Sequence, residues 1–237
     1  MKFHLLALAT LAVSGAAHAD DIALWNFNSF NCTSNCTAPK ATQTANGGVL
    51  SAVGAVTFSS AGGSGTGSAL NTTSYPAQGT GNLTRGVQFT VSTLGYTDIV
   101  LSFAQRNSNT ASAWTTLRYT LDGSTWQTAT SFLMPAAQST TFVNGITYDF
   151  SSIVGANDND NFGIQLLTSF APGTSSYLAT GTGASYGTGG TIRYDNVLFT
   201  GNAIPDAPLP VPEPHTYALM LAGLATVGLM ARRRRAN

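Results

Sequence analysis

The sequence is poor in charged residues, and this shortage excludes several classes of protein. Asp, Glu, Lys and Arg make up 8% of its 237 residues, whereas soluble domains average about 25%. The ten basic and ten acidic residues cancel, and no basic cluster lies in the body of the chain. Because nucleic-acid binding needs a concentrated basic surface, we expect no nucleic-acid partner.

Histidine and glutamate are missing from the middle of the chain. The three histidines are His4, His18 and His215, and the single glutamate is Glu213. A Ser-His-Asp or Cys-His hydrolase therefore lacks its base, and a zinc site lacks its usual ligands. A glycosidase would have to work with two aspartates. We expect a protein without catalytic residues.

The first residues have the organisation of a secretory signal. Lys2 precedes an apolar run over 5–13, and Ala17-His18-Ala19 provides small residues before a cleavage point. This pattern predicts a signal peptide over 1–19, cleaved between Ala19 and Asp20. The run is too short for a first transmembrane helix, so we expect export by the Sec machinery.

The only two cysteines, Cys32 and Cys36, lie close together. Exported proteins meet an oxidising compartment, so we predict a disulfide between them. A metal or redox pair is the alternative, but no third ligand is nearby.

The other end of the chain has three parts. A Pro-Glu-Pro motif precedes an uncharged, mostly apolar stretch over 216–231, which predicts one short transmembrane helix. Four arginines follow and would hold that end in the cytoplasm, with their stems helping the helix to span the inner membrane. The motif and the basic tail are Val211, Pro212, Glu213 and Pro214, and Arg232, Arg233, Arg234 and Arg235.

Residues 211–235 resemble the PEP-CTERM sorting signal of Gram-negative bacteria, because motif, apolar segment and arginine cluster follow one another in that order. In that family an exosortase recognises the signal, and its bearers are exported to a surface or matrix rich in exopolysaccharide. The resemblance implies that Pro212, Glu213 and Pro214 are the recognition element. His215 stands where many members have Ser or Thr.

The remaining chain divides into an ectodomain over 20–202 and a proline-rich stalk over 203–210. Apolar and polar residues alternate in several short segments, which predict β-strands. Asp122-Gly123 predicts a hairpin turn, and a change of phase near Asp195-Asn196 predicts a bulge. A region rich in Gly, Ser and Thr extends to about Thr84, with a weak strand around 55–58 and a flexible loop over 62–67. The expected strands are 22–27, 87–91, 99–103, 117–121, 141–150, 162–167 and 191–200.

Strands about ten residues apart, with little helical periodicity, indicate an all-β fold, an antiparallel β-sandwich. Residues 117–123 and 190–197 resemble parts of the jelly-roll domains often found with this sorting signal. Those domains resemble carbohydrate-binding modules, so the resemblance implies a polysaccharide ligand.

Trp114, Tyr177 and Tyr186 are the candidates for stacking on sugar rings, since each lies in or beside a predicted loop. Packing of Trp114 in the core is the alternative. The arginines at 106, 118 and 193 could instead form ion pairs with Asp195.

The segment 157–161 alternates Asn and Asp and offers many oxygen atoms to a calcium ion. It does not fit an EF-hand loop, because Phe162 occupies an acidic position and Ser169 the place of the bidentate glutamate. A structural calcium held by Asp158 and Asp160 is one hypothesis, and a solvated turn is the other. We expect no other cofactor.

We therefore expect a non-catalytic protein that is anchored by its C-terminal helix before processing and then released to the cell surface or extracellular matrix. It would associate with exopolysaccharide or other matrix components. A purely structural or adhesive coat protein is the alternative, and a secreted hydrolase a third. Residues 20–212 hold five basic residues and nine aspartates, a formal charge of −4.

Overall fold

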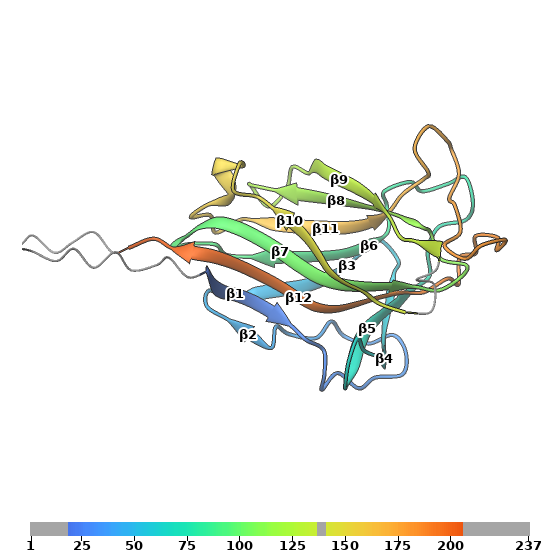
Figure 1. The fold of residues 1–237 in the computed structure, drawn as a ribbon, viewed down its shortest axis with the longest axis horizontal. Coiled ribbons are helices and arrows are strands. Elements are labelled where there is room, and N and C mark those ends of the chain that lie inside the picture. The colour runs from blue at the N-terminus through green and yellow to red at the C-terminus, as the bar shows by residue number, and fades with distance from the viewer. Residues whose placement is uncertain (1–18, 137–140, 206–237) are drawn as a thin grey trace, which may run out of the picture. The chain divides into compact units, whose positions relative to one another are not determined.

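The computed structural model describes residues 19–136 and 141–205, which form two antiparallel β-sheets packed face to face (Figure 1). The predicted antiparallel sandwich is therefore confirmed. Within these residues no helix has the length and apolarity needed to cross a membrane. The predicted signal peptide up to residue 18, the sorting signal and the transmembrane segment lie outside the described residues.

Two sheets share the strands unequally. The seven-stranded sheet has the order β10-β7-β12-β1-β2, with β5 also paired to β12 and β4 to β5. The five-stranded sheet has the order β3-β6-β11-β8-β9. The strands are β1 (Ala19–Trp25), β2 (Gln43–Thr44), β3 (Gly48–Val53), β4 (Thr57–Gly62), β5 (Ser68–Thr73), β6 (Gly86–Val91), β7 (Tyr96–Asn107), β8 (Trp114–Thr120), β9 (Gln127–Leu133), β10 (Val143–Asp149), β11 (Gly163–Thr168) and β12 (Ile192–Ala203).

Eight of these strands have the order of a jelly roll. Without β2 to β5, the two sheets read β1-β12-β7-β10 and β6-β11-β8-β9. The chain thus passes repeatedly from one sheet to the other, as two interlocked Greek keys require. Strand β3 extends the five-stranded sheet at its edge, whereas β5, with β4 beside it, pairs with the part of β12 that β1 does not reach.

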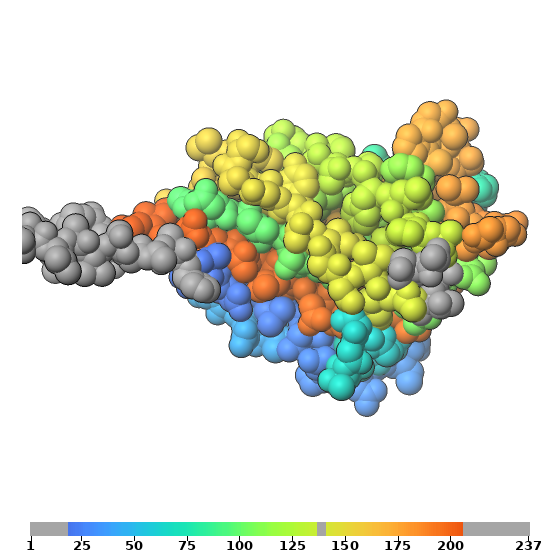
Figure 2. Space-filling model, viewed as in Figure 1, coloured from blue at the N-terminus to red at the C-terminus, as the bar shows by residue number. Residues whose placement is uncertain are grey.

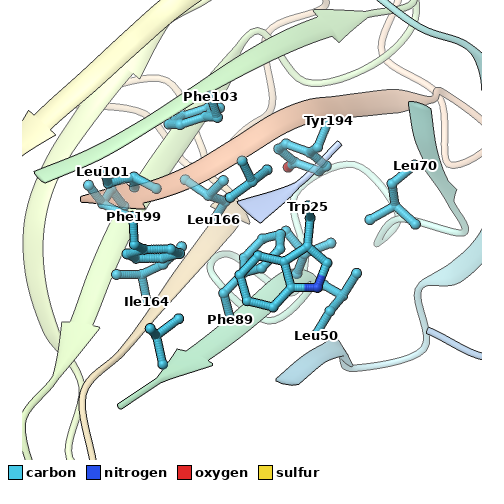
Figure 3. Packing of buried hydrophobic residues seen from close by; sticks show 14 of the residues in the cluster. Trp25, Leu50, Leu70, Phe89, Leu101, Phe103, Ile164, Leu166, Tyr194 and Phe199 are labelled. Carbon is cyan, nitrogen blue, oxygen red and sulfur yellow. The ribbon is translucent and has the colours of Figure 1, made fainter. Parts of the chain in front are cut away.

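The core lies between the sheets and is built from the apolar positions of the alternating strands (Figure 3). Trp25 from β1 packs edge-on against Phe89 of β6, with ring centroids 5.0 Å apart. Phe162 makes similar contacts with Phe150 and Phe199. Contacts between rings of opposite sheets hold the layers together through buried apolar area.

Strand β12 contains the predicted bulge. It pairs with β5 over its first residues and with β1 over its last, and its register against β7 shifts between Asp195 and Leu198. Asn196 has a positive φ of 48° at this point. The bulge lets one strand serve both neighbours while its apolar side chains stay in the core.

The region up to Thr84 is more ordered than its composition suggests. The weak strand expected around 55–58 begins at Thr57 as β4, and β3 and β5 flank it as strands that the pattern did not reveal. The loop predicted over 62–67 is a surface turn between β4 and β5, in which Ser64 donates from its N–H (2.7 Å) and hydroxyl (3.0 Å) to the Asp195 carboxylate. This turn is thereby attached to β12.

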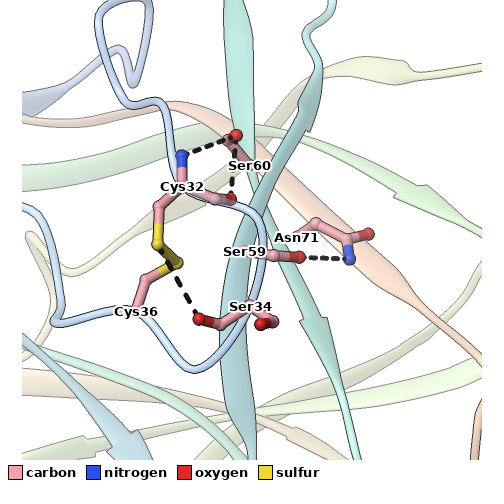
Figure 4. The surroundings of a disulfide bond; sticks show 6 residues. All are labelled: Cys32, Ser34, Cys36, Ser59, Ser60 and Asn71. Atoms are coloured by element: carbon pink, nitrogen blue, oxygen red, sulfur yellow. Dashed lines mark hydrogen bonds between the residues drawn. A yellow bond between two sulfur atoms is a disulfide. The ribbon is translucent and has the colours of Figure 1, made fainter.

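The predicted disulfide between Cys32 and Cys36 is present and fastens a loop along β4 (Figure 4). The Cys36 N–H donates to the carbonyl of Phe58 at 3.0 Å. Cys32 accepts from the Ser60 N–H at 2.7 Å and donates its own N–H to the Ser60 hydroxyl at 3.0 Å. The disulfide loop thus satisfies polar groups of a strand at the sheet edge.

Candidate functional site

The connections of the sandwich separate into two ends (Figure 1). What we call the terminal end holds both ends of the described chain, since Ala19 pairs with Asn202, together with the start of β7 and the segments 92–95, 121–126 and 150–162. The loop end holds the segments 74–85, 108–113 and 169–191, two of which are long. Large polar connections at one end of a rigid sandwich are a common location for binding sites.

Tyr177 and Tyr186 lie together at the loop end. Their rings stack with centroids 4.5 Å apart, and Phe170 packs edge-on against Tyr177 at 4.7 Å. The Tyr177 hydroxyl donates to the carbonyls of Gly81 (2.9 Å) and Thr80 (3.1 Å). Tyr177 is 3% exposed, so its faces are occupied by protein in this structure.

Tyr186 is the outer ring of this pair and is half-buried. Its hydroxyl donates to the carbonyl of Pro76 at 2.8 Å. Burial raises the pKa of both tyrosines above the ordinary value, more strongly for Tyr186, where the neighbouring Tyr177 adds to the effect. The two neutral rings tie segment 169–191 to segment 74–85.

A buried polar network lies beneath these loops. The Gln105 amide donates to Asn107 Oδ1 (2.9 Å) and to Thr115 Oγ1 (3.1 Å). The Asn107 amide donates to the Ser112 carbonyl (2.8 Å) and to Thr180 Oγ1 (3.2 Å). All five residues are nearly or fully buried. Gln105 Oε1 is buried without a partner, but the other polar groups are paired, and these hydrogen bonds specify how the loop-end segments sit on the sheets.

Trp114 begins β8 and lies outside the core. Its neighbour Thr115 accepts a hydrogen bond from Gln105 inside the sandwich, so alternation directs Trp114 and Thr116 to the outer face of the five-stranded sheet. Trp114 is half-buried there, and Thr116 contacts the Ser131 hydroxyl at 2.8 Å. Core packing, the alternative to ligand contact, is not what the structure shows.

A row of polar residues crosses the same outer face. One residue of each strand lies opposite the next in register, and every one of them is polar. We call this set the polar row. In the order of the strands it is Ser51, Gln88, Gln165, Arg118 and Thr128.

Hydrogen bonds connect the polar row but leave part of it unpaired. Gln165 donates to Gln88 Oε1 at 2.9 Å, and Arg118 Nη2 donates to the Trp126 carbonyl at 2.8 Å. Arg118 Nε is buried without a partner. Gly163, beside the row on β11, carries no side chain that could cover it. Amides, a guanidinium and hydroxyls on the same face as a tryptophan can bind the hydroxyls and the apolar face of a sugar.

Residues of the acidic segment 157–161 form hydrogen bonds that join the connections at the terminal end. Asp158 Oδ1 accepts the Gly95 N–H at 2.8 Å, and the Asn159 amide donates to the carbonyls of Leu121 (3.0 Å) and Gly155 (2.7 Å). Asp160 is exposed. Within 19–136 and 141–205, no three His, Cys, Asp or Glu residues group as metal ligands. The calcium hypothesis for Asp158 and Asp160 stays a prediction.

Two other carboxylates have a lowered pKa, whereas an acid catalyst needs a raised one. Asp122 Oδ1 accepts the N–H groups of Thr125 (2.6 Å) and Ser124 (2.8 Å), which lower its pKa far below the ordinary value. The Ser151 N–H lowers the pKa of Asp149 in the same way. A glycosidase acid requires a raised pKa. Asp122 also forms the predicted hairpin turn between β8 and β9, which is confirmed.

The expected ion pairs are not formed. Asp195 accepts from Ser64 and from the Asn196 N–H (2.9 Å), and Arg193 Nη1 donates to the Gly62 carbonyl at 3.3 Å. The alternative that joined the arginines to Asp195 is therefore wrong, because the bulge directs the carboxylate to the β4–β5 turn.

Sequence reasoning found Trp114 but missed the polar row. Gln88 and Gln165 each stand between two buried apolar residues, and Arg118 stands between buried Leu117 and partly buried Tyr119, so alternation assigns all three to an outer face. The alternating pattern does not reveal that the strands carrying these residues are neighbours, nor the register in which they pair.

Comparison with known proteins identifies the end of the chain. Residues 210–235 match the family model of the PEP-CTERM protein-sorting motif, which indicates an exported protein processed by an exosortase. No curated protein is similar enough to be matched. Among solved structures, the N-terminal CBM22-1-CBM22-2 tandem domain from Paenibacillus barcinonensis Xyn10C is similar, with 12% identity and a TM-score of 0.45. The match covers 82% of this chain and 52% of the tandem, so the chain spans about half of its length.

Proposed function

We propose that this chain is a non-catalytic protein of the cell surface or extracellular matrix, delivered by its sorting motif, whose sandwich binds exopolysaccharide. The match at residues 210–235 carries the proposal, because bearers of that motif are exported and processed. Cleavage after Ala19 would leave Asp20 on β1, where it pairs with Gly201, so processing there would preserve the strand.

The polar row with Trp114 supports polysaccharide as the ligand. An extended chain of sugars can lie across several strands and exchange its hydroxyl–water hydrogen bonds for bonds to Gln88, Arg118 and Thr128. Trp114, four residues before Arg118 on the same face of β8, would stack on one ring. Tyr186 would contact the chain beyond the sheet, and Tyr177 would hold Tyr186 in place through their stacked rings.

Binding is tested with the full chain on an array of bacterial and plant polysaccharides. Trp114→Ala should weaken binding of the retained glycan by about 30-fold, equivalent to the roughly 2 kcal/mol lost when a central aromatic contact is truncated. Trp114→Phe should retain most of the affinity. Val49→Ala removes a 62% exposed side chain from the opposite edge of the same sheet and is the matched control. Absence of binding to every glycan on the array would contradict this function and favour a structural coat protein.

Delivery is tested separately in a host that expresses an exosortase. Glu213→Ala should leave the chain unprocessed in the inner-membrane fraction, whereas the parent protein should appear at the surface with its tail removed. Equal processing of both would contradict the role of the motif.

A further inference from the structure

Two arginines face each other on the outer surface of the seven-stranded sheet. Arg106 of β7 lies directly opposite Arg193 of β12. Their neighbours Gln105 and Tyr194 are buried inside the sandwich, so both guanidinium groups lie on the outer face, where each residue is partly exposed. Like charges in directly opposed positions destabilise a sheet.

No carboxylate neutralises this pair. Asp195 is engaged by Ser64 and Asn196, and Arg193 donates to the carbonyl of Gly62. The side chain of Arg106 forms no hydrogen bond or ion pair with the described residues. Burial and then the charge of Arg106 lower the pKa of Arg193. The two positive charges are thus close, partly desolvated and uncompensated.

Uncharged polar groups continue the line across two more strands. Asn71 of β5 lies opposite Arg193, and Ser59 of β4 lies opposite Asn71. The Asn71 amide donates to the Ser59 hydroxyl at 3.0 Å, while Asn71 Oδ1 is buried without a partner. Figure 2 shows β12 (orange) at the surface between the segments of β10 (yellow) and those of β4 and β5 (cyan).

We propose that Arg106 and Arg193 bind an oxyanion, the carboxylate or sulfate group of an acidic polysaccharide, and that Asn71 and Ser59 contact its neighbouring hydroxyls. Guanidinium groups bind planar oxyanions through paired hydrogen bonds, and an anion between them converts their repulsion into attraction. The open sheet surface suits an extended polymer. The polymeric nature of the ligand rests on the proposed function, whereas the oxyanion site does not.

The test is affinity electrophoresis of the full chain in gels containing polygalacturonate, dextran sulfate or neutral dextran at one ionic strength. The parent protein should be retarded by polygalacturonate, dextran sulfate or both, and the effective polymer identifies the anion. Arg106→Gln should weaken this retardation at least about tenfold, since a hydrogen bond to a charged group is lost. Lys40→Gln removes the same charge elsewhere and should change it less than about twofold.

The proposal is overturned if neither charged polymer retards the parent protein, or if both variants lose retardation equally. Arg106→Gln should also leave the melting temperature unchanged or raise it, because it relieves repulsion and breaks no hydrogen bond; a clear fall would make Arg106 a structural residue and overturn the proposal. Neutral glycans bound through Trp114 should be unaffected by Arg106→Gln, so the two sites fail independently.

Discussion

At the terminal end of the sandwich carboxylates accept backbone N–H groups, whereas at the loop end amides and hydroxyls form a buried network beneath the loops. Asp122, Asp149 and Asp158 illustrate the first arrangement, and Asn107 with Gln105 the second. Every aspartate of the described residues except Asp195 belongs to the terminal end; the set is Asp20, Asp21, Asp98, Asp122, Asp149, Asp158 and Asp160.

Three arginines lie toward the other end. Arg85 donates to the Ser74 carbonyl in segment 74–85, and Arg106 and Arg193 lie where β7 and β12 meet the loop end. The few charges are therefore separated along the strands: the aspartates other than Asp195 lie at the terminal end, and these three arginines lie toward the loop end. This comparison indicates that carboxylates stabilise tight turns at the terminal end, whereas neutral polar side chains stabilise the loops at the loop end.

The largest expected effect is at the apolar part of the terminal end. Phe150 is fully buried and contacts the rings of Tyr119, Tyr148 and Phe162. Phe150→Ala should lower the free energy of unfolding by about 3–5 kcal/mol, measured by urea denaturation. Phe170→Ala at the loop end, where the ring is half-buried, should cost about 1–2 kcal/mol. Equal losses would refute the contrast in packing between the ends.

The buried network should make the loop end more sensitive than the terminal end to loss of an amide. Asn107→Ala leaves Gln105, Ser112 and Thr180 with unpaired groups and should cost about 2–3 kcal/mol in the same measurement. Asn202→Ala removes one exposed hydrogen bond, to Asp98 at 2.9 Å, and should cost less than about 1 kcal/mol. A larger loss for Asn202→Ala would reverse the comparison.

Removal of a single hydroxyl should loosen the loop end with little effect on global stability. Tyr177→Phe deprives the carbonyls of Thr80 and Gly81 of a donor and should cost about 1 kcal/mol. Hydrogen exchange should accelerate in segment 74–85 and remain unchanged in segment 150–162. Equal acceleration in both segments would show that the ends are coupled.

The smallest expected effect is a loss of stability at low pH that arises at the terminal end. The folded-state pKa values of Asp122 and Asp149 are lowered, so their stabilisation is present above the unfolded value of about 3.9 and is lost as pH falls through and below it. The melting temperature should decrease from pH 5 to pH 2. Asp122→Asn should flatten this decrease, whereas Asp160→Asn, an exposed aspartate in the same region, should not. Identical pH profiles would contradict the assignment.

Strands with one wholly apolar face were predicted most directly. Val87, Phe89 and Val91 alternate with polar residues, and β6 is found where they lie. Strands β3 and β5 were missed because GVLSAV and SALNTT contain small or polar residues at many positions and lack strong alternation. Their pairing with β6, β4 and β12 supplies the order that their own side chains do not.

The candidate sites were harder to predict from the sequence than the fold. Trp114 was recognised by residue type, but its place on an outer face depends on which neighbour points inward. Arg106 and Arg193 are far apart in the chain and become opposed only through the register of β7 and β12. A shift of one residue in that register would direct one of them into the core.

The amino-acid sequence by itself determined the features that depend on neighbouring residues: the disulfide of Cys32 and Cys36, the turn at Asp122-Gly123, the bulge at Asp195-Asn196 and the sorting motif near the C-terminus. Only the tertiary structure decided where the charges lie relative to one another. Local features follow from backbone preferences over a few residues. The polar row and the opposed arginines depend on the pairing of distant strands, which burial of the whole core selects.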